Sequence, residues 1–92
     1  MRCATTAIAA LVPRQRSRVA GDVHSVVSFE RPWVRTDAVL VDGTGALVLR
    51  FLGRASVPGV SAGARAVVEG TPALERGVIL MRDPLYSFAT VE

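Results

Sequence analysis

The chain of 92 residues contains no lysine, one cysteine and one histidine, and only 5% of its residues are aromatic. All 11 basic residues are therefore arginines, and with 8 acidic residues they give a net charge of +3. A charge of this size permits binding to nucleic acid without requiring it. The single cysteine, Cys3, excludes an internal disulfide and fits a reducing compartment, so we expect a cytoplasmic protein and an incidental thiol.

Long apolar runs are also missing, since none approaches the roughly 20 residues that span a bilayer. Near the N-terminus, most of the arginines follow the apolar segment Ala7–Val12, which disfavours a secretory signal. No acid precedes Asp22, which leaves a mitochondrial presequence as the alternative. We favour an N-terminal arm over residues 1–16, with a short helix at Thr6–Leu11 that ends before Pro13.

What the chain does have is a high content of apolar residues, at 50%, with valine abundant. β-branched side chains fit a pleated surface, and apolar and polar residues alternate with the period of a strand. Short strands with turn signals about every 8–12 residues predict one small all-β domain over residues 17–92, closed into a barrel that removes exposed edges. The expected strands are Ser17–Phe29, Val34–Val41, Ala46–Leu52, Ala64–Thr71 and Val78–Arg82, the last continued at an edge by Leu85–Val91 after Asp83 and Pro84.

The segments between these strands carry turn residues. Asp42–Gly45 favours a tight hairpin, because Asp hydrogen-bonds backbone two residues on and Gly permits a positive φ. Residues 54–62 are too short and too rich in Pro and Gly for more than a turn of 3-10 helix, and Pro72–Gly77 is expected to be a turn. Gly21 is the expected bulge or kink in the long first strand.

Several short motifs follow one another in a fixed order over about residues 8–88. They are Leu11–Arg16, Val19–Val23, Asp42–Gly45, Leu52–Arg54, Val57–Val60, Val68–Gly70 and Asp83–Tyr86. With them the chain resembles the actinobacterial-type OB-fold nucleic-acid-binding domain proteins, and distantly the wedge-type OB domain of the branch-migration helicase that remodels forks. The resemblance implies a five-stranded Greek-key OB barrel and a single-stranded nucleic-acid ligand, DNA before RNA. Where the family more often has Asn-Pro, this chain has Asp83-Pro84, which adds an acid near the expected ligand face.

No pattern in the sequence indicates catalysis, a metal or a cofactor. A metal site needs clustered His, Cys and carboxylate ligands, and the one His is far from the one Cys. His24 is expected to be a surface residue of a strand. Asp42–Gly45 lacks the Gly-Lys-Ser/Thr ending of a phosphate-binding loop. We therefore expect a protein without enzymatic activity and without a cofactor.

Binding is expected on the outer face of the second and third strands, which is the usual ligand platform of an OB barrel. If Leu47, Leu49 and Phe51 point inward, Arg50 points outward, and the same alternation leaves Arg35 outside. Single-strand binders combine such cations with aromatic side chains on which bases stack. The expected nucleic-acid-binding residues are Arg31, Trp33, Arg35, Arg50, Arg54, Arg76 and Tyr86, with Phe88 as a further aromatic candidate.

Each of these residues has an alternative interpretation. Arg35 and Arg50 could simply keep an open surface solvated, and Trp33 could close one end of the barrel. Val39, Val41 and Val48 form an outward apolar stripe, which is typical of a protein contact. The second hypothesis is therefore a homodimerisation or protein-interaction module that is accessory to a DNA-processing assembly.

Overall fold

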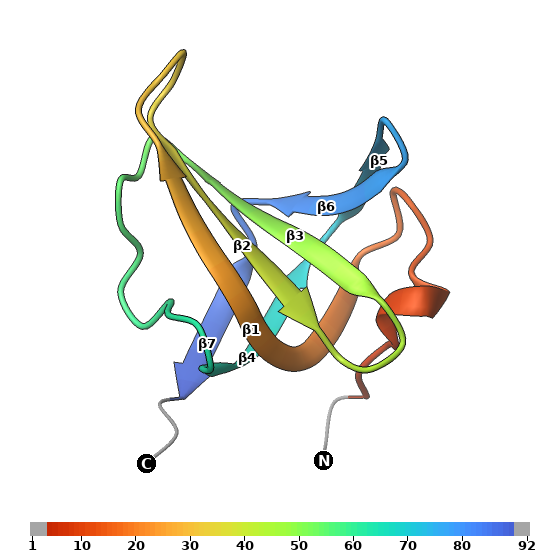
Figure 1. Cartoon of the computed structure of the whole chain (residues 1–92). Coiled ribbons are helices and arrows are strands. Elements are labelled where there is room, and N and C mark those ends of the chain that lie inside the picture. Colours follow the sequence, from red (N-terminus) through yellow and green to blue (C-terminus); the bar gives the residue numbers. More distant parts are fainter. Residues whose placement is uncertain (1–3, 90–92) are drawn as a thin grey trace.

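The computed structural model describes residues 4–89, with side chains as far as Ser87, so Cys3, the Phe88 side chain and residues 90–91 of the last expected strand lie outside the description. The described chain is all-β, with a single mixed sheet ordered β5-β6-β3-β2-β1-β4-β7 after a short 3-10 helix (Figure 1). The elements are η1 (Ile8–Ala10), β1 (Ser17–Phe29), β2 (Arg35–Val41), β3 (Ala46–Leu52), β4 (Arg65–Gly70), β5 (Pro72–Glu75), β6 (Val78–Arg82) and β7 (Leu85–Ala89).

The described residues form seven strands in an open sheet, rather than the five strands of a closed barrel that the sequence predicts. The two additional strands have different origins. Asp83 and Pro84 separate β6 from β7, as the sequence predicts, whereas β5 follows β4 after Thr71, where the sequence predicts a turn. Pro84 has no N–H to pair, and Asp83 adopts a left-handed φ of 48°. β7 does lie at an end of the sheet, as expected for the segment after Pro84.

The sequence predicts a turn at Pro72–Gly77, but the structure has a strand over Pro72–Glu75. Pro72–Glu75 pairs antiparallel with β6, so the turn shortens to Arg76 and Gly77, both at positive φ. Proline is tolerated there because it is the first residue of a strand at the end of the sheet.

β1 is a long strand that pairs with two neighbours (Figure 1). Its first part pairs with β4 and its second part with β2. The register with β2 shifts between Val23 and Ser25, so His24 is the extra residue of a β-bulge. Gly21, where the sequence predicts the bulge or kink, is instead a point of close approach. A Cβ at Gly21 would lie 2.5 Å from the carbonyl oxygen of Val41.

The N-terminal arm packs against the β2–β3 turn. Its helix is the three-residue η1 instead of the expected Thr6–Leu11. Within residues 4–89, no helix is long and apolar enough to cross a bilayer. Ile8 is buried, and its N–H donates to Asp42 Oδ2 at 2.9 Å. Thr44 Oγ1 accepts from the Ala9 N–H at 3.1 Å and donates to Asp42 Oδ1 at 2.6 Å. The Thr44 hydroxyl first, then the Ile8 N–H and the Thr44 N–H, all donating to Asp42, hold the pKa of Asp42 down at about 2.

The burial pattern of β2 and β3 alternates as the sequence predicts. The inward side chains Ala38, Leu40, Leu47, Leu49 and Phe51 are all buried in the core. Arg35, Asp37 and Arg50 point to the other face and are half-buried. The loop that follows β3 has no helix and contributes Val57 to the core.

Candidate nucleic-acid interface

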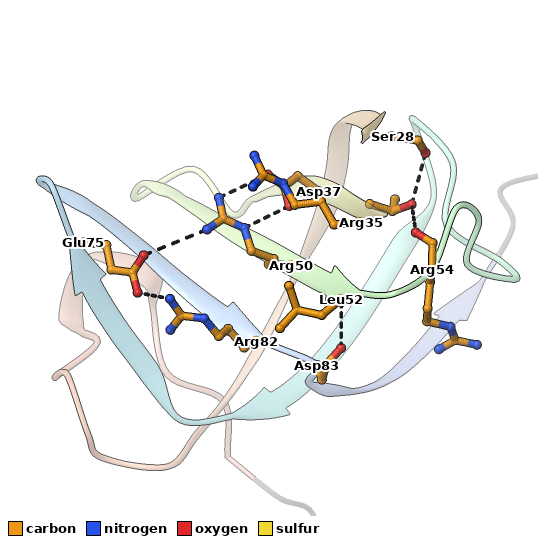
Figure 2. Close-up of polar contacts among 10 residues, drawn as sticks. Ser28, Arg35, Asp37, Arg50, Leu52, Arg54, Glu75, Arg82 and Asp83 are labelled. Carbon is orange, nitrogen blue, oxygen red and sulfur yellow. Dashed lines mark hydrogen bonds and ion pairs between the residues drawn. The ribbon is translucent and has the colours of Figure 1, made fainter. Parts of the chain in front are cut away.

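Five charged side chains form a chain of ion pairs on the outer face of the sheet, from here on the arginine–carboxylate row (Figure 2). Its members are Arg35 and Asp37 on β2, Arg50 on β3, Glu75 on β5 and Arg82 on β6. Asp37 lies directly opposite Arg50, and Arg50 is in register with Arg82 across the parallel β3–β6 pair. The row therefore connects four strands.

Each carboxylate in the row is shared by two guanidinium groups. Asp37 accepts two hydrogen bonds from Arg50, at 3.1 Å from Nε and 3.2 Å from Nη2, and its Oδ2 is 3.6 Å from Arg35 Nε. Glu75 Oε1 lies 3.9 Å from Arg50 Nη1, and Oε2 accepts from Arg82 Nη2. Two carboxylates thus offset much of the charge of three arginines.

Arg35 is held by a second contact, since its guanidinium carbon lies 4.4 Å from the centroid of the Phe29 ring. A cation over an aromatic face is attracted by the quadrupole of the ring. The Arg35 Nε is buried and has no hydrogen-bond partner among the described residues. Phe29 lies opposite Arg35 across the β1–β2 pair, so this contact follows directly from the register.

An open hollow of about 400 Å³ lies beside the row and brings together three of the predicted arginines. Val78 is the exposed apolar part of its lining, because Leu80 is almost fully buried although it lies on the outer face in register with Val48. The lining residues are Arg35, Arg50, Glu75, Arg76, Val78 and Leu80. A hollow with an apolar surface and cationic walls suits a flat apolar ring that carries an anionic group.

Trp33 and Arg31 lie in the loop between β1 and β2, at the far end of the hairpin from the β2–β3 turn. The Trp33 side chain is 73% exposed, so it does not close the end of the sheet. In Figure 1 this loop projects at the upper left, and the β5–β6 turn that carries Arg76 projects at the upper right. The exposed indole of Trp33 and the exposed guanidinium of Arg76 therefore lie in two separate loops of the molecule.

Three of the predicted arginines have no ion-pair or hydrogen-bond partner for their guanidinium groups within residues 4–89: Arg31, Arg54 and Arg76. Arg54 follows the end of β3, where the Gly53 N–H donates to the Val34 carbonyl and draws this segment toward the β1–β2 loop. Its backbone carbonyl accepts from Thr36 Oγ1 at 2.8 Å. Figure 2 shows its guanidinium directed away from the arginine–carboxylate row, so the structure does not gather Arg54 with Arg35 and Arg50.

Tyr86 lies apart from the other predicted site residues. It is on β7, at the end of the sheet, and its ring meets the buried Phe51 edge to face at a centroid distance of 5.4 Å. It packs against the core, and with Arg18 it lines a different hollow. Tyr86 therefore lies outside the candidate interface.

The sequence-based reasoning missed Glu75 and Arg82. Both join the arginine–carboxylate row because β6 pairs in parallel with β3 and because Pro72–Glu75 is a strand. A parallel pair between segments so far apart in the chain leaves no local signal in the sequence. The alternation of Val78, Leu80 and Arg82 could have placed Arg82 on one face, but not beside Arg50.

No protein-family model and no curated protein matches this chain. The chemistry of the interface follows from its own side chains. Within residues 4–89, His, Cys, Asp and Glu side chains form no group of three that could hold a metal ion. The side chains of this face are guanidinium groups that suit phosphate oxygens, the exposed Trp33 ring that suits a base, and a small apolar surface at Val78.

Proposed function

We propose that this chain is an OB-fold module that binds single-stranded nucleic acid, DNA before RNA, without enzymatic activity. The observation that carries the proposal is the outer face of β2, β3 and β6. There an arginine-lined hollow lies on the same sheet as a loop with an exposed tryptophan. Single-strand binders combine these two elements, because cations follow the backbone while every base presents a face for stacking.

The pairing of the strands supports the OB assignment. If β4 with β5, and β6 with β7, are each taken as one bent strand, five strands result. β1 then pairs with the first half of one bent strand, β3 pairs in parallel with the first half of the other, and the two bent strands pair with each other. That order returns to its start, as in the partly open five-stranded Greek-key barrel of an OB fold.

The ligand path that we propose runs from the β1–β2 loop to the β5–β6 turn. Trp33 stacks on a base at one end, Arg35 and Arg50 contact phosphates in the middle, and Arg76 contacts a phosphate at the other end. Arg31 adds a cation beside Trp33. Guanidinium groups are suited to this role because their planar fork matches two phosphate oxygens at once.

Affinity is expected to be modest and dependent on salt. About four phosphate contacts on a single strand give a slope of log K against log salt near −3, which is a loss on the order of 50-fold between 50 and 200 mM salt. The net charge of +3 and the two carboxylates in the arginine–carboxylate row leave little long-range attraction beyond these contacts.

The experiment is an anisotropy titration of labelled oligo-dT at several salt concentrations with two test variants and one control variant. Trp33→Ala should weaken binding by about 1–3 kcal/mol through lost stacking. Arg76→Ala should weaken it several-fold and reduce the salt slope by about 0.7, the share of one phosphate contact. Both side chains are exposed, so neither change should alter folding.

The matched control is Arg65→Ala, which removes the same charge from β4, outside the proposed path. Arg65 pairs with Asp22 at 3.2 Å, and both side chains are more than half exposed. Its removal should change oligo-dT binding by less than about two-fold. Equal losses of affinity for Arg65→Ala and Arg76→Ala would show that the net charge of the protein, and not a defined binding path, determines the affinity. That result would contradict the proposal.

The dimerisation hypothesis stays a prediction. Val39 and Val48 lie directly opposite each other on β2 and β3, and both are half-buried, as is Val41. None of the three is among the strongly exposed apolar side chains of the described residues. The stripe therefore offers a partner less apolar surface than the sequence pattern predicts.

A further inference from the structure

The two carboxylates of the arginine–carboxylate row are held differently. The Asp37 side chain is 16% exposed and takes two hydrogen bonds from the Arg50 fork, while the Glu75 side chain is 41% exposed and meets Arg50 at 3.9 Å. Glu75 is also the last residue of β5, next to the turn at Arg76 and Gly77. Asp37 is thus fixed inside the row, and Glu75 is at its open margin.

A carboxylate that is bound by two guanidinium groups occupies a position that suits a phosphate group. Both anions accept hydrogen bonds from the same planar fork. Glu75 sits between Arg50 and Arg82, beside the hollow that Arg76 also lines. In the free protein, therefore, the anion position shared by Arg50 and Arg82 is filled by the protein's own side chain (Figure 2).

We propose that Glu75 is an internal competitor for one phosphate position of the bound strand, and that Asp37 is the positioning residue that keeps Nη1 of Arg50 aimed at that position. The proposal deepens the function proposed above and rests on it. When a strand binds, a phosphate replaces the Glu75 carboxylate between Arg50 and Arg82, and Glu75 turns into solvent. Asp37 keeps its two hydrogen bonds to Arg50 throughout.

Two opposite consequences follow for the two acids. Removing the charge of Glu75 frees Arg50 and Arg82 for phosphate and removes a repulsion of the backbone, so binding tightens. Removing the charge of Asp37 releases the fork of Arg50 and the Nε of Arg35, so these groups lose their fixed direction and binding weakens. A simple effect of net charge would make both changes tighten binding equally.

The test compares Glu75→Gln with Glu69→Gln in oligo-dT titrations over a range of salt. Glu69 is the matched control because it also holds two arginines, at 3.0 Å from Arg16 and 2.9 Å from Arg18, and these pairs lower its pKa. It lies on β4, at most about 20 Å from Glu75 at the usual rise of a strand, and its ion-pair partners among the described residues include neither Arg50 nor Arg82. Each variant changes the net charge by the same amount.

Glu75→Gln should bind oligo-dT about three- to ten-fold more tightly than the wild type at low salt, with a salt slope steeper by about 0.7. Glu69→Gln should stay within about two-fold of the wild type. Glu75→Ala should bind as tightly as Glu75→Gln. This second variant separates the loss of charge from any contact that the glutamine amide itself makes. Asp37→Asn should bind more weakly than the wild type at a temperature where circular dichroism shows it to be folded.

Each outcome decides the proposal. If the wild type binds and Glu75→Gln binds no more tightly than Glu69→Gln, the competitor role is wrong while the proposed function stands. If Asp37→Asn tightens binding as much as Glu75→Gln, the two acids act through charge alone and the positioning role is wrong. If neither the wild type nor Glu75→Gln binds any single strand, the proposed function and this inference fail together.

Discussion

At the scale of the residue, Asp42 shows how one side chain fixes a segment that the sequence leaves open. Its carboxylate accepts hydrogen bonds from the backbone of the arm at Ile8 and from Thr44 within its own turn. The sequence predicts the turn, because Asp followed by Gly is a turn signal, but the contact with the arm spans 34 positions along the chain. No local pattern specifies so distant a partner.

The contribution of Asp42 should depend on pH. Its pKa is lowered from 3.8 to about 2 in the folded protein, chiefly by the Thr44 hydroxyl and then by the Ile8 N–H. The folded state therefore holds the ionised form more strongly than the unfolded chain does. The resulting stability is complete above the unfolded pKa and is lost as the pH falls through the folded pKa.

We predict that Asp42→Asn lowers the free energy of unfolding by about 1 kcal/mol near neutral pH, a value below the usual range for a hydrogen bond to a charged group because the site is partly exposed. Urea denaturation between pH 2 and 7 measures it. The difference between the variant and the wild type should shrink between pH 4 and pH 2. A difference that is constant down to pH 2 would show that the charge of Asp42 has no part in holding the arm.

At the scale of the element, β1 is the strand that joins the two halves of the sheet. It passes from β4 to β2 within thirteen residues, and both the bulge at His24 and the close approach at Gly21 lie next to the change of partner at Asp22. The sequence predicts a long strand with an irregularity at Gly21. It does not separate the two features, because a bulge is defined by the register of the partner strand.

Gly21→Ala should be strongly destabilising for this reason. The added Cβ would lie 2.5 Å from the Val41 carbonyl oxygen, which is backbone and cannot turn aside, so we expect a loss of about 3 kcal/mol, the upper end of the usual cost of overpacking. Gly45→Ala is the control, since its Cβ would meet a side-chain methyl of Ile8 at 3.2 Å. Thermal denaturation that shows equal losses for the two variants would contradict this reading of β1.

At the scale of the whole molecule, the sequence predicts which face each strand buries better than it predicts which strands are neighbours. Alternation in Ala46–Leu52 is enough to place Leu49 inside and Arg50 outside, because side chains on a strand point to opposite faces in turn. The open seven-stranded order and the parallel contact of β3 with β6 depend on pairing between distant segments.

The same limit applies to the candidate site. Arg35, Arg50 and Trp33 could be chosen from local patterns, and the structure places the first two at one hollow and leaves the third exposed. Glu75, an ion-pair partner of Arg50, could not be chosen, because it reaches Arg50 from another part of the sheet. Tyr86 is a candidate by its aromatic type, but its contact with Phe51 depends on how the core packs around it.

The central claim is that one face of this molecule, from the β1–β2 loop over β2 and β3 to the β5–β6 turn, binds single-stranded nucleic acid. The most direct test is a map of backbone amide chemical shifts during titration with oligo-dT of about ten nucleotides, a length within the usual site size of one OB fold. We predict that the largest changes fall at Trp33, Arg50, Arg76 and their neighbours, and that β4 and β7 change little. Changes centred on Val67 and Ser87, or none at low salt, would contradict the account.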